Sequence, residues 1–236
     1  MTKIKHLPFV FVFLASVAFA QESPSPTETA SASPEQTPSP SPAALTTRNV
    51  PLRFVPPPME GTISLGIFDS NDKLVRVLHR EAKIDIFTID ENALKTTWDG
   101  KNDAGEDLPA GKYRARGYLV GRLRVEEVSP TAHPPVADSA PDHIPVKLVT
   151  NPLVSDTRAV MDLGIGFDGK GSFLKTMDGL PLATVNQASN LARVAIAKIG
   201  EKPAIVWQDD GATAKEFNIF NIEKMMAFDC GFFELK

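Results

Sequence analysis

Alternation of apolar and polar residues with a period of two is the feature that most constrains how this chain folds. Between residues 61 and 69, Ile63, Leu65 and Ile67 alternate with Thr62, Ser64 and Gly66. Such alternation indicates a strand with one buried face. Further strand-like segments cover 73–79, 94–98, 112–120, 161–167, 172–177, 194–199, 204–207, 217–222 and 225–233. No segment of comparable strength has a helical period, so the sequence predicts an all-β fold.

Turn residues separate these segments. Asp168-Gly169-Lys170-Gly171 and Gly200-Glu201-Lys202 each stand between two apolar runs. Glycine and aspartate favour the backbone conformations of tight hairpin turns. We therefore expect a β-hairpin at each of these positions.

The first twenty residues have the pattern of a secretory signal peptide. Lys3 and Lys5 precede an apolar run over 7–20, which closes on Ala18-Phe19-Ala20. The alternative is a membrane anchor, but fourteen residues reach only about 21 Å, short of a hydrocarbon core of about 30 Å. We expect cleavage after Ala20 and export to the periplasm, the cell surface or the exterior.

Residues 21–50 form a Pro/Ser-rich segment with no large apolar residue before Leu45. A segment of this composition cannot bury enough surface to offset the entropy of ordering, so it is predicted to be a disordered linker. A second proline-rich stretch, 129–146, is expected to be a loop between two β units. The predicted organisation is thus a sandwich over 51–128 and a smaller β-rich unit over 147–236.

Residues 61–120 resemble the Ig-like module of the flagellar hook-capping protein family, the FlgD-like Ig domain. The resemblance rests on the runs 63–69 and 73–78 and on a closing run over 98–113. In the closing run the motif residues are Trp98, Asp99, Gly100, Asn102, Gly105, Pro109, Gly111 and Tyr113. The resemblance implies an Ig-like β-sandwich, in a family whose module also recurs in secreted and surface proteins.

The closing run is interpreted as a β-hairpin without chemistry of its own. The Trp98 ring is large enough to fill a sandwich core, and Tyr113 re-enters the sheet with its hydroxyl near the rim. Asp99 and Asn102 are suited to accept backbone N–H groups, and the glycines permit positive φ angles. All these roles are structural.

The C-terminal part is faintly similar to a β-propeller blade, in the run 166–171 and the strand after it. A closed propeller needs at least four blades of about 40–50 residues, and residues 150–236 hold at most two. Two alternatives remain open: a small β unit packed on the Ig-like module, or a fragment of a longer propeller protein.

Metal and catalytic signatures are weak. The acidic loop Asp99–Asp107 offers oxygen ligands for calcium, but Lys101 and Ala104 occupy positions where an EF-hand-type loop needs a ligand and a glycine. His133 and His143 lack the spacing and partners of a zinc site. No nucleophile elbow, phosphate-binding loop or H-E-x-x-H motif is present. We predict no cofactor, no metal and no enzymatic activity.

The charge and cysteine content of the chain restrict the classes of partner that it is expected to bind. The chain carries a net charge of −4 and has no clustered basic segment, which argues against nucleic acid. Its single cysteine, Cys230, excludes an internal disulfide and is expected to pack among Phe228, Phe232 and Phe233. The predicted function is an exported structural or interaction protein with an envelope protein or polysaccharide as partner. The alternative is a polysaccharide- or peptide-binding protein, for which Trp207 and Phe217 are weak surface candidates.

Overall fold

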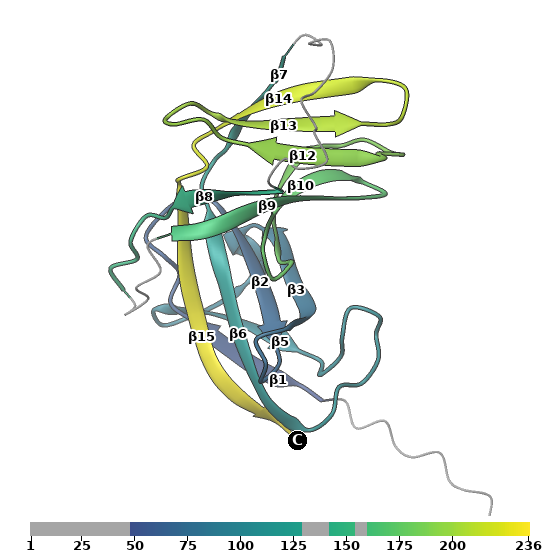
Figure 1. The fold of residues 1–236 in the computed structure, drawn as a ribbon. Helices are drawn as coiled ribbons and strands as arrows, with labels where there is room; N and C mark the ends of the chain where they lie inside the picture. Colours follow the sequence, from purple (N-terminus) through teal and green to yellow (C-terminus); the bar gives the residue numbers. More distant parts are fainter. Residues whose placement is uncertain (1–47, 129–141, 154–159) are drawn as a thin grey trace, which may run out of the picture. The chain divides into compact units, whose positions relative to one another are not determined.

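A computed structural model describes residues 48–128, 142–153 and 160–236, and it confirms the all-β fold. The described residues form fifteen strands in four antiparallel sheets, plus one short 3-10 helix at Ile84–Ile86 (Figure 1). None of their helices is long and apolar enough to cross a membrane. The expected signal peptide and most of the expected linker lie outside the described residues.

A long four-stranded sheet is shared by both halves of the fold. Its strand order is β15-β6-β2-β3. The bounds are β2 (Thr62–Phe68), β3 (Leu74–Ala82), β6 (Gly111–Val120) and β15 (Met225–Leu235). β15, at the end of the chain, pairs with β6 from Met225 opposite Val120 to Leu235 opposite Gly111. Figure 1 shows these two strands side by side over their full length.

A three-stranded sheet packs on one face of the shared sheet. Its order is β1-β5-β4, with β1 (Val50–Phe54), β4 (Thr88–Asp90) and β5 (Ala93–Trp98). We call the apolar cluster between the two sheets the Trp98 core; its members include Leu65, Ile67, Leu94, Trp98 and Phe228. These two sheets form a sandwich with seven strands.

Two further four-stranded sheets form the second half of the fold. The first has the order β11-β10-β9-β8, with β8 (His143–Lys147), β9 (Val160–Asp168), β10 (Gly171–Thr176) and β11 (Pro181–Asn186). The second has the order β12-β13-β14-β7, with β7 (Arg124–Val128), β12 (Arg193–Ala197), β13 (Ala204–Asp209) and β14 (Ala214–Phe220). The expected hairpins at 168–171 and 200–202 join β9 to β10 and β12 to β13.

The core of the second half also includes one end of the shared sheet. We call this cluster the Leu182 core; it contains Leu163, Leu182, Val206 and Phe217 together with Tyr118, Val120, Met225 and Ala227 of β6 and β15. Along β15, Met225 and Ala227 face this core, whereas Phe228 and Leu235 face the Trp98 core. The two cores are therefore built on the same two strands.

Close packing on both faces explains the small residues of the shared sheet. A Cβ at Gly117 would lie 2.3 Å from the Ser64 carbonyl oxygen, and a Cβ at Gly66 would lie 2.6 Å from a Leu74 methyl group. Ser64 is fully buried, and its hydroxyl lies 3.4 Å from the Leu182 carbonyl. The segment was expected to bury one face only. Its second face is covered because serine and glycine leave room for the second half to approach.

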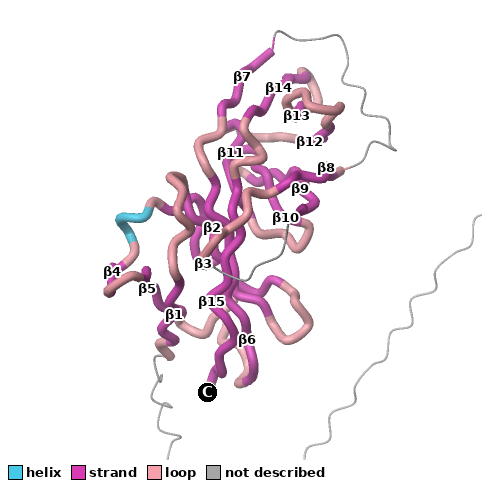
Figure 2. Tube along the Cα trace, turned by 90° about the vertical axis from the view of Figure 1, so that its left-hand side faces the viewer, coloured by secondary structure: helices cyan, strands magenta, loops and turns pink. Residues whose placement is uncertain are grey.

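The strands do not follow the expected division at the proline-rich stretch. β7, from before the stretch, pairs with β14, whereas β15, from the end of the chain, pairs with β6 (Figure 2). β8 is His143–Lys147, so the end of the expected loop over 129–146 is a strand. Pro145 is tolerated there because β8 is an edge strand, where a missing N–H need not break a ladder.

Candidate functional site

The Trp98 ring lies at the centre of the seven-stranded sandwich. Its side chain is fully buried, with Tyr113 and Phe233 packed edge-on at centroid distances of 5.3 and 5.7 Å. The indole Nε1–H donates to the Lys101 carbonyl at 2.9 Å. The Tyr113 hydroxyl donates to the Pro109 carbonyl at 2.9 Å. Both rings therefore fill the core and hold the ends of the loop between β5 and β6.

The polar residues of this loop bond to its own backbone. Asp99 Oδ1 accepts the Lys101 N–H at 3.1 Å. Asn102 Oδ1 accepts the N–H groups of Ala104 and Glu106, each at 2.9 Å. Gly100 and Gly105 have φ angles of 76° and 81°, which a residue with a Cβ adopts only with strain. The motif residues thus build a loop, and the expected hairpin is wrong, because the strands on either side of the loop, β5 and β6, lie in different sheets and do not pair.

In the part of the chain that the structure describes, no group of three His, Cys, Asp or Glu side chains lies close enough together to hold a metal ion. In the acidic loop, Asp103 lies 3.9 Å from Arg76 and Asp107 lies 3.4 Å from Lys101. His143 bonds Asp142 at 2.9 Å. His133 lies outside the described residues.

The same loop covers the outer edge of β3. The Val77 N–H donates to Asp103 Oδ1 at 3.0 Å, and Arg76 donates to the Asn102 carbonyl at 2.7 Å. An uncovered strand edge is a template for pairing with another chain. The acidic loop thus satisfies a backbone donor that an edge strand would otherwise expose.

A β-bulge at Arg80 and Glu81 interrupts the pairing of β3 with β2. Ala82 lies opposite Ile63 and His79 opposite Leu65, so both bulge residues face Ser64. Glu81 has a φ of 50°, a conformation that favours glycine, and its N–H donates to the Ser64 hydroxyl at 3.2 Å. The bulge directs both side chains toward the second half of the fold.

The bulge side chains bond to β9 and β11. The Thr184 hydroxyl donates to Glu81 Oε1 at 2.6 Å. Arg80 donates to Asp168 Oδ2 at 2.9 Å, and its guanidinium lies over the Phe173 ring at 4.3 Å. These contacts join the shared sheet to the β11-β10-β9-β8 sheet. Such strained positions are often found at functional sites.

Replacing Glu81 tests whether the left-handed backbone is imposed by the fold. Glu81→Ala removes the bond to Thr184 and keeps the backbone strain, whereas Glu81→Gly removes both. We expect the glycine variant to be more stable than the alanine variant by about 1 kcal/mol. Urea unfolding followed by circular dichroism measures the difference. An alanine variant at least as stable as the glycine variant would show that the bulge relaxes.

The Arg80–Asp168 pair predicts a stability difference that depends on pH. The Arg80 hydrogen bond, with help from the Lys170 N–H, lowers the pKa of the Asp168 carboxyl. The carboxylate therefore stabilises the fold above its unfolded pKa of about 4, and this contribution is lost as the pH falls through the folded value. We expect Asp168→Asn to be less stable than the unmodified chain at pH 7 and to approach it near pH 2, as measured by urea unfolding.

A groove opens beside the bulge, where the ends of β2, β3 and β6 approach β11. It encloses about 440 Å³. Val120, Leu123, Val125 and Ala183 supply its aliphatic surface, and the exposed side chains of Glu60, Lys83 and Arg122 supply its charged rim. A smaller hollow of about 200 Å³, lined by Arg80 and Lys170, shares Glu81 and Thr184 with it. The volume of the groove lies within the range of small-ligand sites.

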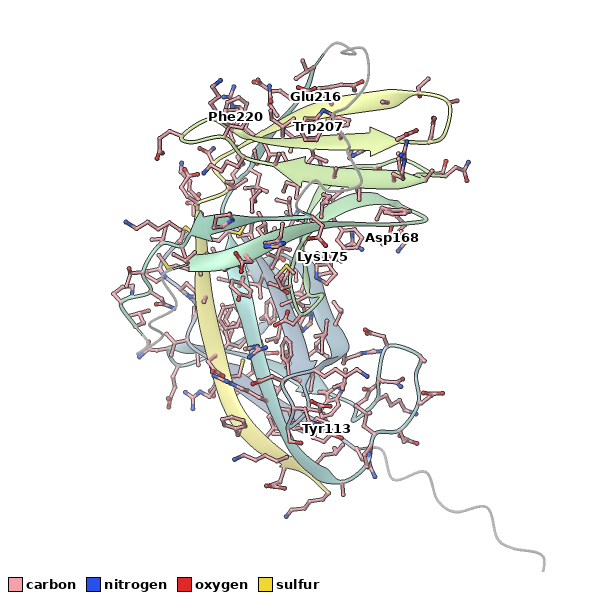
Figure 3. All side chains as sticks on the ribbon, in the orientation of Figure 1. Tyr113, Asp168, Lys175, Trp207, Glu216 and Phe220 are labelled. Atoms are coloured by element: carbon pink, nitrogen blue, oxygen red, sulfur yellow. The ribbon has the colours of Figure 1, made fainter. Side chains whose placement is uncertain are left out.

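Trp207 lies on the outer face of the β12-β13-β14-β7 sheet. Its neighbours Val206 and Gln208 are buried toward the Leu182 core, so the indole is directed away from that core. The indole N–H donates to Glu216 on β14 at 3.0 Å, and Arg124 covers the Phe220 ring at 3.7 Å (Figure 3). Phe217, the other surface candidate, is buried in the Leu182 core. Of the two aromatic candidates, only Trp207 is partly exposed.

Cys230 packs against the Trp98 core and is half-buried. Burial, with the negative charge of Asp229, raises the pKa of the Cys230 thiol. A thiol with a raised pKa is mostly protonated and is a poor nucleophile. The position agrees with a small apolar packing role beside Phe228 and Phe233, whereas Phe232 is exposed and lies outside this core.

No protein-family model matches the sequence, and comparisons with curated proteins and with solved structures give no significant match. The groove was not anticipated from the sequence. Glu81 lies just beyond the strand expected over 73–79, and its left-handed conformation depends on the register of β3 opposite Ser64.

Proposed function

We propose that this chain is an exported, non-enzymatic structural or interaction protein of the bacterial envelope or exterior. In this proposal, a signal peptide directs export, and the Pro/Ser-rich segment is a spacer that holds the β body away from a membrane or cell-wall layer. Residues 61–120 supply a FlgD-like Ig module. The observation that carries the proposal is the continuity of the shared sheet, whose strands β6 and β15 contribute to both cores.

The seven-stranded sandwich supports the Ig-like assignment. Three strands face four across one core, which is the strand count of a constant-type Ig sandwich. One strand of the four, β15, comes from the end of the chain. The module therefore needs the rest of the chain to complete it, and the second half is an integral part of the proposed interaction unit.

A pull-down tests the interaction role. The bait is the chain from Gln21 to Lys236, immobilised through its N-terminus and exposed to envelope extracts at low and high salt. We expect a specific envelope protein or polysaccharide to be recovered. Recovery of nothing across these conditions would contradict the proposal. The mass of the N-terminus in the exporting cell tests cleavage after Ala20.

A second candidate function is polysaccharide binding on the outer face of the β12-β13-β14-β7 sheet. The partly exposed Trp207 favours it, because an indole face packs well on the C–H groups of a sugar ring. A thermal-shift screen against envelope glycans separates the two candidates. A rise in melting temperature that Trp207→Ala abolishes would favour glycan binding.

A further inference from the structure

We propose that the groove between β3 and β11 binds an extended acidic peptide segment that also carries an aliphatic side chain. This inference names the partner class and the surface for the proposed interaction role, and it rests on that role. It is carried by the unpartnered cations of the groove and the adjoining hollow, by the aliphatic lining of the groove and by the meeting of the two spaces at the bulge.

The groove by itself has a balanced lining, with Lys83 and Arg122 against Glu60 and Glu81, and the adjoining hollow adds Arg80 and Lys170. Together the two spaces are lined by four cations and two carboxylates. The whole chain has a net charge of −4. A local excess of cations in an acidic protein favours an anionic ligand through charge complementarity.

Three of the four cations are available to a ligand. Arg80 is paired with Asp168 at 2.9 Å. Among the described residues, the side chains of Lys83, Arg122 and Lys170 have no hydrogen-bond or ion-pair partner. A ligand carboxylate would therefore not have to displace an existing partner. An arginine in such a position can bind a carboxylate through two parallel hydrogen bonds.

The apolar part of the lining distinguishes a peptide from a sugar polymer. Leu123 and Val125 are half-buried, and with Ala183 and Val120 they form an aliphatic surface. Among the described residues, no aromatic ring lines either the groove or the hollow. Burial of a branched aliphatic side chain on such a surface contributes favourable binding free energy, whereas a sugar ring would have no aromatic face to pack on.

The shape of the site favours an extended ligand. The groove and the hollow share Glu81 and Thr184, so the two spaces adjoin at the hydrogen bond between these residues. β3 and β11 are both edge strands of their sheets. A ligand in the groove would contact Arg122 and Lys83, and its continuation past the bridge would reach Lys170.

Fluorescence anisotropy with a labelled short peptide of alternating aspartate and leucine tests the proposal. The full mature chain is expected to bind it, and binding should weaken as salt is raised. Lys83→Glu and Arg122→Glu should each weaken binding about tenfold or more, since each loses a charge-assisted contact and adds a repulsion. Lys73→Glu is the matched control: it makes the same change of charge at an exposed turn outside the groove, and should leave binding unchanged.

Two ligand controls separate the alternatives. A peptide with serine in place of leucine should bind at least several-fold more weakly, because the aliphatic lining then buries no apolar side chain. Equal affinity for the serine peptide would overturn the proposal. The proposal would also be overturned if polygalacturonate bound more tightly than the aspartate–leucine peptide and if Lys83→Glu and Arg122→Glu weakened that binding. Equal losses in all three lysine and arginine variants would also overturn it, since they would indicate non-specific attraction.

Failure of this inference can be told apart from failure of the interaction role. The Lys83→Glu/Arg122→Glu double variant is used as bait in the envelope pull-down. Recovery of the same partner by this variant would overturn the groove assignment and leave the interaction role intact. Loss of the partner in the double variant, with retention in Lys73→Glu, is the result we expect.

Discussion

Replacing Trp98 by alanine is expected to lower the free energy of unfolding by about 3–5 kcal/mol. The ring is fully buried and packs edge-on against Tyr113 and Phe233, so its removal leaves a cavity bordered by two other rings. The Lys101 carbonyl also loses its indole donor. A domain of ordinary stability has only about 5–15 kcal/mol in total, so this one substitution removes a large share.

Trp207→Ala is the matched control for this prediction. It deletes the same side chain from a partly exposed position on the outer face of a sheet, where water or neighbouring side chains can replace the lost contacts. We expect a loss of less than about 2 kcal/mol. Urea unfolding followed by far-UV circular dichroism measures both variants. A Trp98→Ala variant no less stable than Trp207→Ala would contradict the placement of Trp98 at the centre of the core.

The local features of the fold were predictable from the sequence because they depend on neighbouring residues. Alternation at Ile63, Leu65 and Ile67 predicted β2, and the glycines at 100 and 105 predicted a reversal of the chain after Trp98. The hairpin expected there is absent, because β5 and β6 belong to different sheets. The role of Asn102 as an acceptor of loop N–H groups was expected for the same reason. Side-chain period and turn chemistry act over a few residues, and a sequence shows them directly.

Some strands escaped prediction because their sequences follow other constraints. β7 is the charged segment Arg124–Val128, which suits an edge strand that must resist pairing with other chains. β8 contains Pro145 and β11 begins with Pro181, and both lie at sheet edges where proline is tolerated. Edge strands are therefore the elements for which alternation is the weakest guide.

The groove and the pairing of β15 with β6 could not be predicted from the sequence for a different reason. The groove depends on Ser64 lying beside Leu182, 118 residues away, and on a bulge that only the β2–β3 register reveals. The pairing of β15 with β6 likewise joins the end of the chain to its middle. Period-two patterns mark where strands occur and which face is apolar, but they carry no information on which distant strand becomes the neighbour.

Deleting residues 225–236 is expected to abolish cooperative unfolding of the whole β body. The deletion removes β15, and with it Phe228 and Leu235 from the Trp98 core and Met225 and Ala227 from the Leu182 core. It also exposes the full edge of β6, whose N–H and C=O groups on that side then lack partners. We expect loss of the urea transition by circular dichroism and concentration-dependent association in sedimentation.

The expectation would be contradicted if the chain lacking residues 225–236 kept a cooperative urea transition in its second half, as reported by Trp207 fluorescence. Trp98→Phe in the full-length chain is the control, since it leaves Trp207 as the remaining tryptophan of the chain. If β6 and β15 couple the two cores, the urea midpoint that Trp207 reports in this control should equal the midpoint from circular dichroism. It should also lie below the midpoint of the unmodified chain, because a loss of packing around residue 98 then reaches the other core. Separate midpoints would mean that the halves unfold independently and that β15 belongs energetically to only one of them.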